Sequence, residues 1–500
     1  MINLTSIARP YFAHVDRIML SRAMQPEEAQ RAVLHDLTGL TYEDFIKRQS
    51  PVSYEDIRSQ VMRMVDGERD VLCPGRVDRY AQSSGTSGGK SKYIPVSRRA
   101  LKRCHYRGST DVVARYLSEY RDSHLFGGKA LILGGSFANG LDLKRPEVRV
   151  GDLSAHLIEC INPLAGLLRV PDVRTALLQD WHEKLPRLVA QVARENVVSL
   201  SGVPSWMMTV MKEVLKLTGA STIREVWPNL EVFFHGGISF EPYREEYRRL
   251  IGDDRMRYFE TYNASEGFFA VQYRKNARPM LLLQDVDTFY EFVPVAGGDP
   301  VPVWEVIPGK VYEMIITNSA GLTRYRLGDT VKIESINPVT ITIAGRTMQY
   351  INAFGEEVMV FNTDAALART CEVLGASVAD YTAGPCFATC GTRGHHQWLI
   401  EWTGRQPDID KFAALLDENL RKENSDYDAK RTGDIFLDPL EIITVERGTF
   451  DRWLKTTGKL GGQRKIPRLS PDRRYLDEIM RHVHQDPGLR NQNIRIGKTN

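Results

Sequence analysis

The chain contains a run of small hydroxyl residues and glycines from Ser83 to Gly89, followed closely by Lys90 and Lys92. Glycine allows backbone conformations that are closed to other residues, and successive N–H groups in such a turn can converge on an anion. Side-chain hydroxyls and a lysine ammonium would add donors for phosphate oxygens. The hydroxyl donors of the run are Ser83, Ser84, Thr86 and Ser87. The run therefore predicts a phosphate site, although a flexible surface loop can have the same composition.

The nearest familiar phosphate motif is the Walker loop, which has four residues between its first glycine and its Gly-Lys-Ser/Thr ending. Residues 89–91 have that ending, but Ser84 occupies the required glycine position. A Walker loop also leads from a strand into a helix, whereas residues 92–96 have the pattern of a second strand and include Pro95. We therefore expect a hairpin that folds over a triphosphate. A kinase or ATPase built on residues 89–91 is an alternative, which ADP as the product would support.

Two acidic residues stand in settings that suit a nucleotide and its metal ion. Asp329 follows a glycine in residues 324–329, where a turn between two strands is expected. Its carboxylate could accept hydrogen bonds from two vicinal ribose hydroxyls, although a Gly-Asp hairpin turn is the simpler interpretation. Glu266 could bind Mg²⁺, which prefers one or two carboxylates together with substrate phosphates. Alternatively, Glu266 is a solvated loop acid.

Other candidate ligand contacts lie on both sides of these acids. Tyr262 could stack on a purine or be a packed aromatic, and Gly237 ends a strand where a planar base could lie against bare backbone. Arg346 follows a glycine at the start of the last part of the chain. Residues 458–468 form a glycine-containing basic loop in which Lys465 or Lys459 could reach a phosphate. A solvated basic loop has the same pattern.

Hydrophobic patterns predict the elements that must position these residues. The first ~80 residues are patterned as helices. Strands at residues 129–135 and 197–202 then alternate with helices at 175–195 and 241–250, which indicates an α/β layer. Residues 280–343 are patterned as consecutive strands, and the remaining residues mix helix and strand. We place a domain boundary near residue 340, which gives domains of residues 1–340 and 341–500.

Composition excludes several classes of protein. The 500 residues have a net charge of +3 from 66 basic and 63 acidic residues, without the basic stripe of a nucleic-acid binder. The N-terminus has no signal-peptide pattern, and no segment has the ~20 apolar residues that cross a bilayer. The six cysteines lack a disulfide spacing, and Cys386, Cys390, His395 and His396 have the wrong intervals for zinc. We expect a cytoplasmic protein without nucleic-acid or membrane partners.

Read in order, these motifs resemble those of the adenylate-forming superfamily. In detail they resemble the Gretchen Hagen family of acyl-acid amido synthetases, the auxin- and jasmonate-conjugating enzymes of plants and their bacterial relatives. The matching segments are residues 83–95, 202–206, 325–329, 352–357 and 463–468. One departure is Ala264, where plant members usually have Ser-Ser-Glu; Ser265 and Glu266 are retained.

The resemblance implies an adenylate-forming α/β fold. It has a large N-terminal domain of stacked sheets with a β-rich subdomain, and a small, mobile C-terminal α+β domain that rotates over the active site. It also implies that ATP and Mg²⁺ activate a carboxylic acid as an acyl-adenylate, which an amine, usually an amino acid, converts to an amide. Lys465 and Glu266 would be catalytic, and Glu266 would hold the metal. The implied nucleotide contacts are Ser83, Ser84, Gly85, Thr86, Ser87, Lys92, Gly237, Tyr262, Ser265, Asp329 and Arg346.

Two further alternatives start from the same motifs. An acyl-CoA ligase would form the same adenylate but transfer the acyl group to a thiol. A non-catalytic binding protein would retain the fold without turnover. The sequence identifies neither the acid nor the amine.

Overall fold

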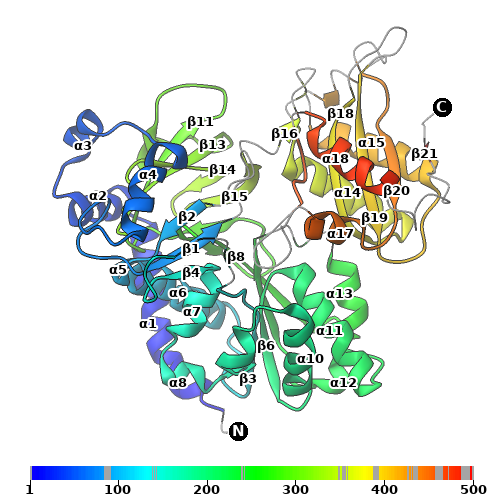
Figure 1. Ribbon diagram of the computed structural model, residues 1–500, viewed down its shortest axis with the longest axis horizontal. Helices are drawn as coiled ribbons and strands as arrows, with labels where there is room; N and C mark the ends of the chain where they lie inside the picture. The colour runs from blue at the N-terminus through cyan, green and yellow to red at the C-terminus, as the bar shows by residue number, and fades with distance from the viewer. Residues whose placement is uncertain are drawn as a thin grey trace. The chain divides into compact units, whose positions relative to one another are not determined.

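The computed structural model describes residues 3–83, 92–137, 139, 141, 143–237, 240, 243–346, 350–351, 356, 358–386, 394–424, 427–428, 431, 437–456, 466–470, 472–485 and 496–497. The chain forms two compact units (Figure 1). The first unit consists mainly of Met1–Ile238 and Arg248–Ile343. The second consists mainly of Ser239–Tyr247, Ala344–Leu460 and Arg464–Asn500.

A 12-stranded mixed sheet runs through the first unit. In spatial order its strands are β12 (Val301–Pro302), β11 (Thr288–Pro294), β13 (Val311–Asn318), β14 (Tyr325–Ile336), β15 (Val339–Arg346), β10 (Met280–Leu282), β9 (Gly267–Gln272), β8 (Arg257–Ala264), β7 (Val232–Gly236), β6 (Val197–Gly202), β3 (Lys129–Ile132) and β5 (Arg169–Val170). Strands β5, β3, β6, β7 and β8 are parallel, and β9 turns back antiparallel to β8. The sheet thus joins an α/β half to an antiparallel half.

Helices precede the sheet and alternate with its parallel strands. Those of the first unit are α1 (Thr5–Ala23), α2 (Pro26–Thr38), α3 (Tyr42–Arg48), α4 (Tyr54–Val65), α5 (Arg98–Ala100), α6 (Tyr106–Glu119), α7 (Leu153–Glu159), α8 (Pro163–Gly166), α9 (Val173–Ala176), α10 (Trp181–Val192), α11 (Pro204–Thr218) and α12 (Ile223–Val226). A π-helix, η1 (Leu101–His105), leads directly into α6. The 3₁₀-helix η3 (Val303–Glu305) also belongs to the first unit, whereas helix α13 (Arg244–Ile251) is shared by both units.

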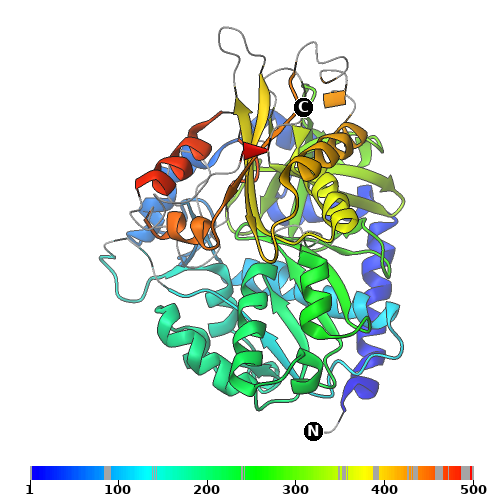
Figure 2. The same ribbon diagram turned by 90° about the vertical axis from the view of Figure 1, so that its right-hand side faces the viewer.

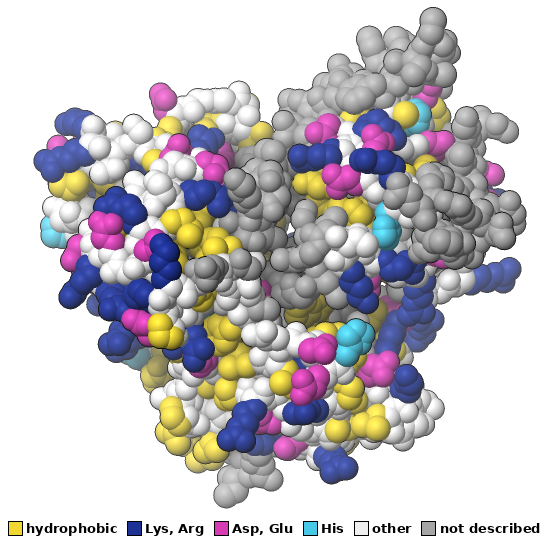
Figure 3. Space-filling model, in the orientation of Figure 1, with side chains coloured by type: hydrophobic (Ala, Val, Ile, Leu, Met, Phe, Trp, Pro, Cys, Tyr) yellow, Lys and Arg dark blue, Asp and Glu magenta, His cyan; other side chains and the backbone are white. Residues whose placement is uncertain are grey.

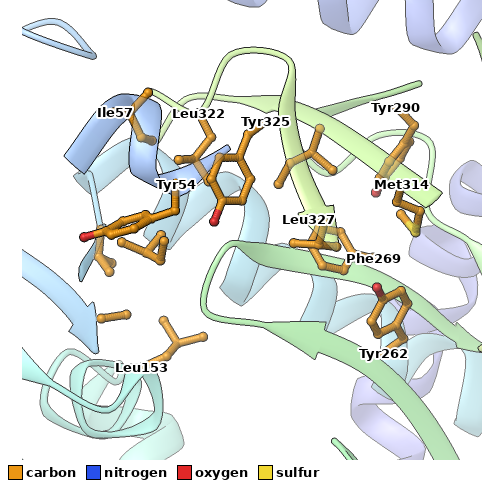
Figure 4. Close-up of a cluster of buried hydrophobic side chains, with 14 of the residues drawn as sticks. Tyr54, Ile57, Leu153, Tyr262, Phe269, Tyr290, Met314, Leu322, Tyr325 and Leu327 are labelled. Atoms are coloured by element: carbon orange, nitrogen blue, oxygen red, sulfur yellow. The ribbon is translucent and has the colours of Figure 1, made fainter. Parts of the chain in front are cut away.

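The core that positions the candidate site lies between α4, a small sheet and the antiparallel half of the large sheet (Figure 4). The small sheet has the order β2 (Lys92–Pro95), β1 (Arg79–Ser83) and β4 (Arg149–Gly151). Helix α4 presents Tyr54, Ile57 and Val61 to this core, at the spacing of one helix face. Burying this apolar face fixes α4 and the small sheet against β14.

The second unit is a four-stranded sheet with helices on both faces (Figure 2). Its strands are β18 (Val378–Cys386), β19 (His395–Trp402), β20 (Glu441–Val445) and β21 (Ile496–Gly497), beside a hairpin of β16 (Tyr350–Ile351) and β17 (Val358–Met359). Its helices are α14 (Val360–Leu374), α15 (Ile409–Glu423), α17 (Thr449–Thr456) and α18 (Arg474–Gln485). Trp398 and Ile400 pack with α14 and α15, whereas Leu399 packs with α17 and α18. This alternation is the period of a strand buried on both faces.

The predicted fold class is confirmed, with two local corrections. The predicted helix at 175–195 is wrong as a single element, because Asp172 caps α9 and Asp180 caps a separate helix, α10. The turn predicted at 324–329 is also wrong. Residues Tyr325–Ile336 form β14, and the bend predicted there is a β-bulge, with a positive φ of 78° at Gly328.

On the face shown in Figure 3, basic and acidic side chains are interspersed over the coloured surface. None of the helices in the described part of the chain is both long and apolar enough to cross a membrane.

Candidate active site

The glycine- and serine-rich run begins within a β-hairpin. Strand β1 pairs antiparallel with β2, and Ser83 lies opposite Lys92 at the base of the connection. The predicted hairpin is therefore confirmed, and the strand-to-helix setting of a Walker loop is excluded because β2 follows the run. Ser84, Gly85, Thr86 and Ser87 lie outside the described residues, as does the side chain of Ser83.

Lys92 projects its ammonium group towards two tyrosine rings. Its Nζ lies 5.9 Å from the ring centroid of Tyr54 and 5.9 Å from that of Tyr325. Both are within the range of cation–π attraction. The same Nζ is 3.5 Å from the Tyr325 hydroxyl, to which it donates. Tyr54 is held in turn by its own hydroxyl, which accepts a hydrogen bond of 2.7 Å from the backbone N–H of Tyr93.

Glu266 lies on the two-residue turn that joins β8 to β9. Its residue is 7% exposed, and its Oε1 is 3.5 Å from the Tyr325 hydroxyl. The Asn318 side chain donates to the Glu266 backbone carbonyl at 2.8 Å. Next to Glu266, the buried hydroxyl of Ser265 has no hydrogen-bond partner among the described residues.

The π-helix η1 is hydrogen-bonded to the chain just after this turn. The Cys104 Sγ accepts a hydrogen bond of 3.2 Å from the backbone N–H of Phe268, two residues after Glu266. Burial raises the pKa of the Cys104 thiol to about 11, so that it stays protonated at neutral pH. A Cβ added to Gly108 would lie 2.4 Å from the Phe268 ring, so the close approach of α6 to the turn requires glycine at this position.

Two predicted nucleotide residues meet although their strands, β8 and β14, are not neighbours in the large sheet. Tyr262 donates from its hydroxyl to Asp329 Oδ2 at 2.7 Å, and both residues are 5% exposed. The ring of Tyr262 is packed at 5.1 Å from that of Phe269. Thus Tyr262 orients the carboxylate that was predicted to bind ribose. Its stacking on a purine stays a prediction.

The Gly236-Gly237 pair ends β7 directly beside β8. A Cβ on Gly236 would lie 2.4 Å from the Thr261 carbonyl oxygen, so only glycine permits this approach. Gly237 has a φ of 83°, in the region that favours glycine, and is exposed. The Thr261 hydroxyl donates to the His235 carbonyl at 3.1 Å. Bare backbone is therefore present at the carboxyl end of a parallel strand, where ligands of α/β sheets bind.

Strand β14 is fixed at its start by a buried ion pair. Arg324 donates to both carboxylate oxygens of Glu291, at 2.7 and 2.9 Å, and its side chain is 7% exposed. Tyr42 donates to the same carboxylate at 3.3 Å. Arg324 has a φ of 44°, a left-handed conformation that a non-glycine residue adopts only when its surroundings impose it. This ion pair fixes the start of β14, and with it the positions of Tyr325 and Asp329 in that strand.

Sequence reasoning missed the supporting residues Tyr54, Cys104, Asn318 and Glu291. Only the helical apolar spacing of Tyr54 gave any signal, and that signal indicates a core position. The side chain of Arg346 and all of Lys465 lie outside the described residues. The structure places Lys92, Glu266, Ser265, Tyr262 and Asp329 in the first unit, and the roles predicted for all the site residues stay predictions.

The comparisons with known proteins agree with the motif order. The GH3 family N-terminal domain matches residues 17–140 and 160–256, the central domain matches 281–346, and the C-terminal domain matches 361–474. The chain belongs to the GH3 family. This is the Gretchen Hagen family that the sequence motifs resemble.

Curated GH3 relatives align over nearly the whole chain. The probable indole-3-acetic acid-amido synthetase GH3.1 of Arabidopsis thaliana is 24% identical over 91% of this chain and 89% of its own. The jasmonoyl–L-amino acid synthetase JAR6 of Nicotiana attenuata is 24% identical over 87% of each chain. The 4-substituted benzoates-glutamate ligase GH3.12 of Arabidopsis thaliana is 25% identical over 85% of this chain and 87% of its own.

Solved structures share the fold. The GH3.15 acyl acid amido synthetase in complex with 2,4-DB has a TM-score of 0.72 at 19% identity, over 95% of this chain and 94% of its own. A 2-hydroxyisobutyryl-CoA ligase in the postadenylation state has a TM-score of 0.55 at 13% identity, over 94% and 92% of the two chains. The GH3 chain thus has the adenylate-forming fold.

Proposed function

We propose that this GH3 chain is an ATP-dependent acyl-acid amido synthetase. The carboxylate of an acid attacks the α-phosphorus of ATP, and the bond to the pyrophosphate oxygen breaks, giving an acyl-adenylate and pyrophosphate. The nitrogen of an amine, most simply of an amino acid, then attacks the acyl carbon. AMP leaves with the bonding electrons, and the nitrogen loses a proton as the amide forms.

Two contacts support this proposal: Lys92 and Glu266 share the Tyr325 hydroxyl, and Asp329 accepts from the Tyr262 hydroxyl. Three sequence segments far apart in the chain bring these residues into one unit, where a tyrosine hydroxyl contacts each of the two carboxylates. A nucleoside triphosphate can be bound by a cation at its phosphates, an acid at its metal ion and an acceptor at its ribose. Reactions at its phosphates depend on positioning and on neutralisation of charge. The named GH3 relatives that conjugate acids to amino acids support the choice of an amine acceptor.

In this proposal, Asp329 binds the ribose hydroxyls and Tyr262 fixes the carboxylate by its 2.7 Å hydrogen bond. The bare backbone at Gly237 receives the adenine. Because both oxygens of a carboxylate can accept hydrogen bonds, Asp329 can bind Tyr262 and ribose at once.

The phosphates would be held by Lys92 and by the hydroxyls and backbone of residues 83–87. Glu266 fits Mg²⁺ because it is an oxygen donor beside the buried Ser265 hydroxyl, which has no partner among the described residues. When bound there, Mg²⁺ supplies positive charge that stabilises the leaving pyrophosphate. The backbone of Glu266 is held by a 2.8 Å hydrogen bond that the Asn318 side chain donates to its carbonyl.

Lys465 and Arg346 complete the proposal from the C-terminal part of the chain. We assign Lys465 a phosphate contact delivered by a mobile domain of residues 341–500, and Arg346 a nucleotide contact near the hinge. Rotation of such a domain would expose the adenylate to the amine after pyrophosphate leaves. The match of residues 463–468 to the GH3 motif supports the choice of Lys465.

The decisive experiment is ATP–pyrophosphate exchange over a panel of aryl, indolyl and fatty acids, followed by mass spectrometry with mixed amino acids. We expect exchange with at least one acid and a mass that corresponds to an amide. A thioester with CoA and no amide would instead identify an acyl-CoA ligase, and ADP as product would identify a kinase or ATPase. The absence of exchange with every acid would favour a non-catalytic binding protein.

A further inference from the structure

The hydroxyl of Tyr325 lies between the phosphate-binding cation and the metal-binding acid of the proposed site. It accepts from Lys92 Nζ at 3.5 Å and donates to Glu266 Oε1 at 3.5 Å. A hydroxyl has one donor and two acceptor positions, so it can serve a cation and a carboxylate at the same time. The contact links β2 to the β8–β9 turn, two segments far apart in the sequence.

The Tyr325 ring has little freedom to move its hydroxyl. Its residue is 0% exposed and lies beside Tyr54 and Leu322 in the core (Figure 4). On either side of Tyr325, the Arg324 carbonyl accepts from Val52 at 2.9 Å, and the Arg326 N–H donates to the Val52 carbonyl at 2.8 Å. The backbone on both sides is thus tied to the segment that leads into α4.

Tyr54 limits Lys92 from the other side. The Lys92 ammonium lies 5.9 Å from each of the two ring centroids, and the two rings come from α4 and β14. The attraction of the two rings therefore favours conformations of the flexible Lys92 side chain that place its ammonium group near both rings. The rings attract a cation without taking its hydrogen-bond donors, because the attraction comes from the ring face.

We propose that Tyr325 is a positioning residue that holds the Lys92 ammonium and the Glu266 carboxylate at a fixed separation. The proposal rests on the proposed adenylating function. Opposite charges at short range attract, and a direct ion pair would consume donors and acceptors needed for phosphate and metal. A neutral hydroxyl between them contacts both groups and occupies only one position on each. Because the hydroxyl is neutral, it neutralises neither group, so the ammonium and the carboxylate keep their charges for phosphate and metal.

The same core contains a matched control. Tyr290 is also 0% exposed and belongs to the same hydrophobic cluster. Its hydroxyl has no hydrogen-bond partner among the described residues. Removing that hydroxyl therefore tests the loss of one buried oxygen from this core without disturbing Lys92 or Glu266.

The test compares Y325F and Y290F in the full chain by calorimetric titration. The probes are a non-hydrolysable ATP analogue at several magnesium concentrations, and AMP without metal. We expect Y325F to need about tenfold more magnesium for half-maximal binding of the analogue, the size of a lost hydrogen bond to a charged group. Binding of AMP and the thermal midpoint should stay near wild type, and Y290F should match wild type throughout.

Two outcomes would overturn the proposal. The magnesium requirement of Y325F could equal that of Y290F, or Y325F could lose AMP binding in parallel, which would indicate a structural role only. Failure of the enzymatic proposal is distinguishable, because it would appear as absent pyrophosphate exchange in wild type with magnesium-dependent binding intact. Wild type that does not bind the analogue would overturn both.

Discussion

Arg324, which directly precedes β14, and Tyr325, its first residue, hold charged partners in opposite ways. Arg324 binds Glu291 through two short hydrogen bonds of 2.7 and 2.9 Å, and the Glu291 side chain is 1% exposed. Tyr325 contacts Lys92 and Glu266 at 3.5 Å each. Arg324 and Glu291 bind each other directly. Lys92 and Glu266 instead each contact the neutral hydroxyl of Tyr325.

The difference separates framework from site. A buried bidentate pair satisfies most of its donors and acceptors, so little remains for a ligand, and losing one partner strands a buried charge. A neutral hydroxyl leaves the charges of Lys92 and Glu266 uncompensated by it, as the proposed phosphate and metal contacts require. Burial raises the pKa of Glu291, and the hydrogen bonds and charge of Arg324 and the hydrogen bond of Tyr42 oppose this shift.

Breaking the framework pair should give the largest effect on stability. In E291Q, Arg324 stays buried with its charge uncompensated, and we expect the free energy of unfolding to fall by about 3 kcal/mol. Urea denaturation followed by circular dichroism measures this change. The pyrophosphate exchange rate per folded molecule should stay within about twofold of wild type.

An apolar replacement of both partners provides the control. The double variant E291L/R324M should recover most of the lost stability, because replacing a buried ion pair by packed apolar groups is often neutral. If E291Q is as stable as wild type but loses exchange, the Arg324–Glu291 pair belongs to the site and not to the framework.

Removing the fixed acceptor should give the largest effect on activity. In D329A the proposed ribose contacts disappear, and we expect exchange to fall about 100-fold, the size of one or two hydrogen bonds to a charged group. In D329N an oxygen for Tyr262 remains, so the loss should be about tenfold. Near-normal exchange in D329A, with an unchanged thermal midpoint, would refute the ribose assignment.

Lowering the pH should reduce the free energy of unfolding through two buried histidines, His105 and His156. Burial lowers the pKa of His105 to about 4 and that of His156 to about 4. Below pH ~6.5 the unfolded chain takes up protons that the folded chain does not, so stability is lost as pH falls from ~6.5 to ~4. The variant H105L should reduce the slope of unfolding free energy against pH by about one proton. Equal slopes in both proteins would show that His105 titrates normally.

The support under the Glu266 turn should give the smallest effect. In C104A the buried N–H of Phe268 loses its acceptor, and we expect a loss of about 1 kcal/mol in stability and a few-fold rise in the magnesium needed for exchange. In C104S an acceptor remains, so the magnesium requirement should return towards wild type. A C104S protein that behaves like C104A would mean that sulfur volume, rather than hydrogen bonding, matters here.

Local patterns predicted much of the fold. The strand periodicity of residues 92–96 correctly indicated the β1–β2 hairpin, and the alternation at 129–135 and 197–202 indicated the parallel strands β3 and β6. The turn at 324–329 was mispredicted because a Gly-Asp pair also marks a bulge. A bulge keeps the strand going and differs from a turn only through its partner strand, β13.

The sequence by itself determined which chemistry is present: the hydroxyl and glycine run, Lys92, Glu266 and Asp329 in an order that matches the GH3 family. Tertiary structure decided how these groups are held. The Tyr325 bridge, the Tyr262–Asp329 hydrogen bond and the Cys104 support join residues 59 to 233 positions apart. Such contacts depend on which distant elements pack against each other, and no local pattern records that choice.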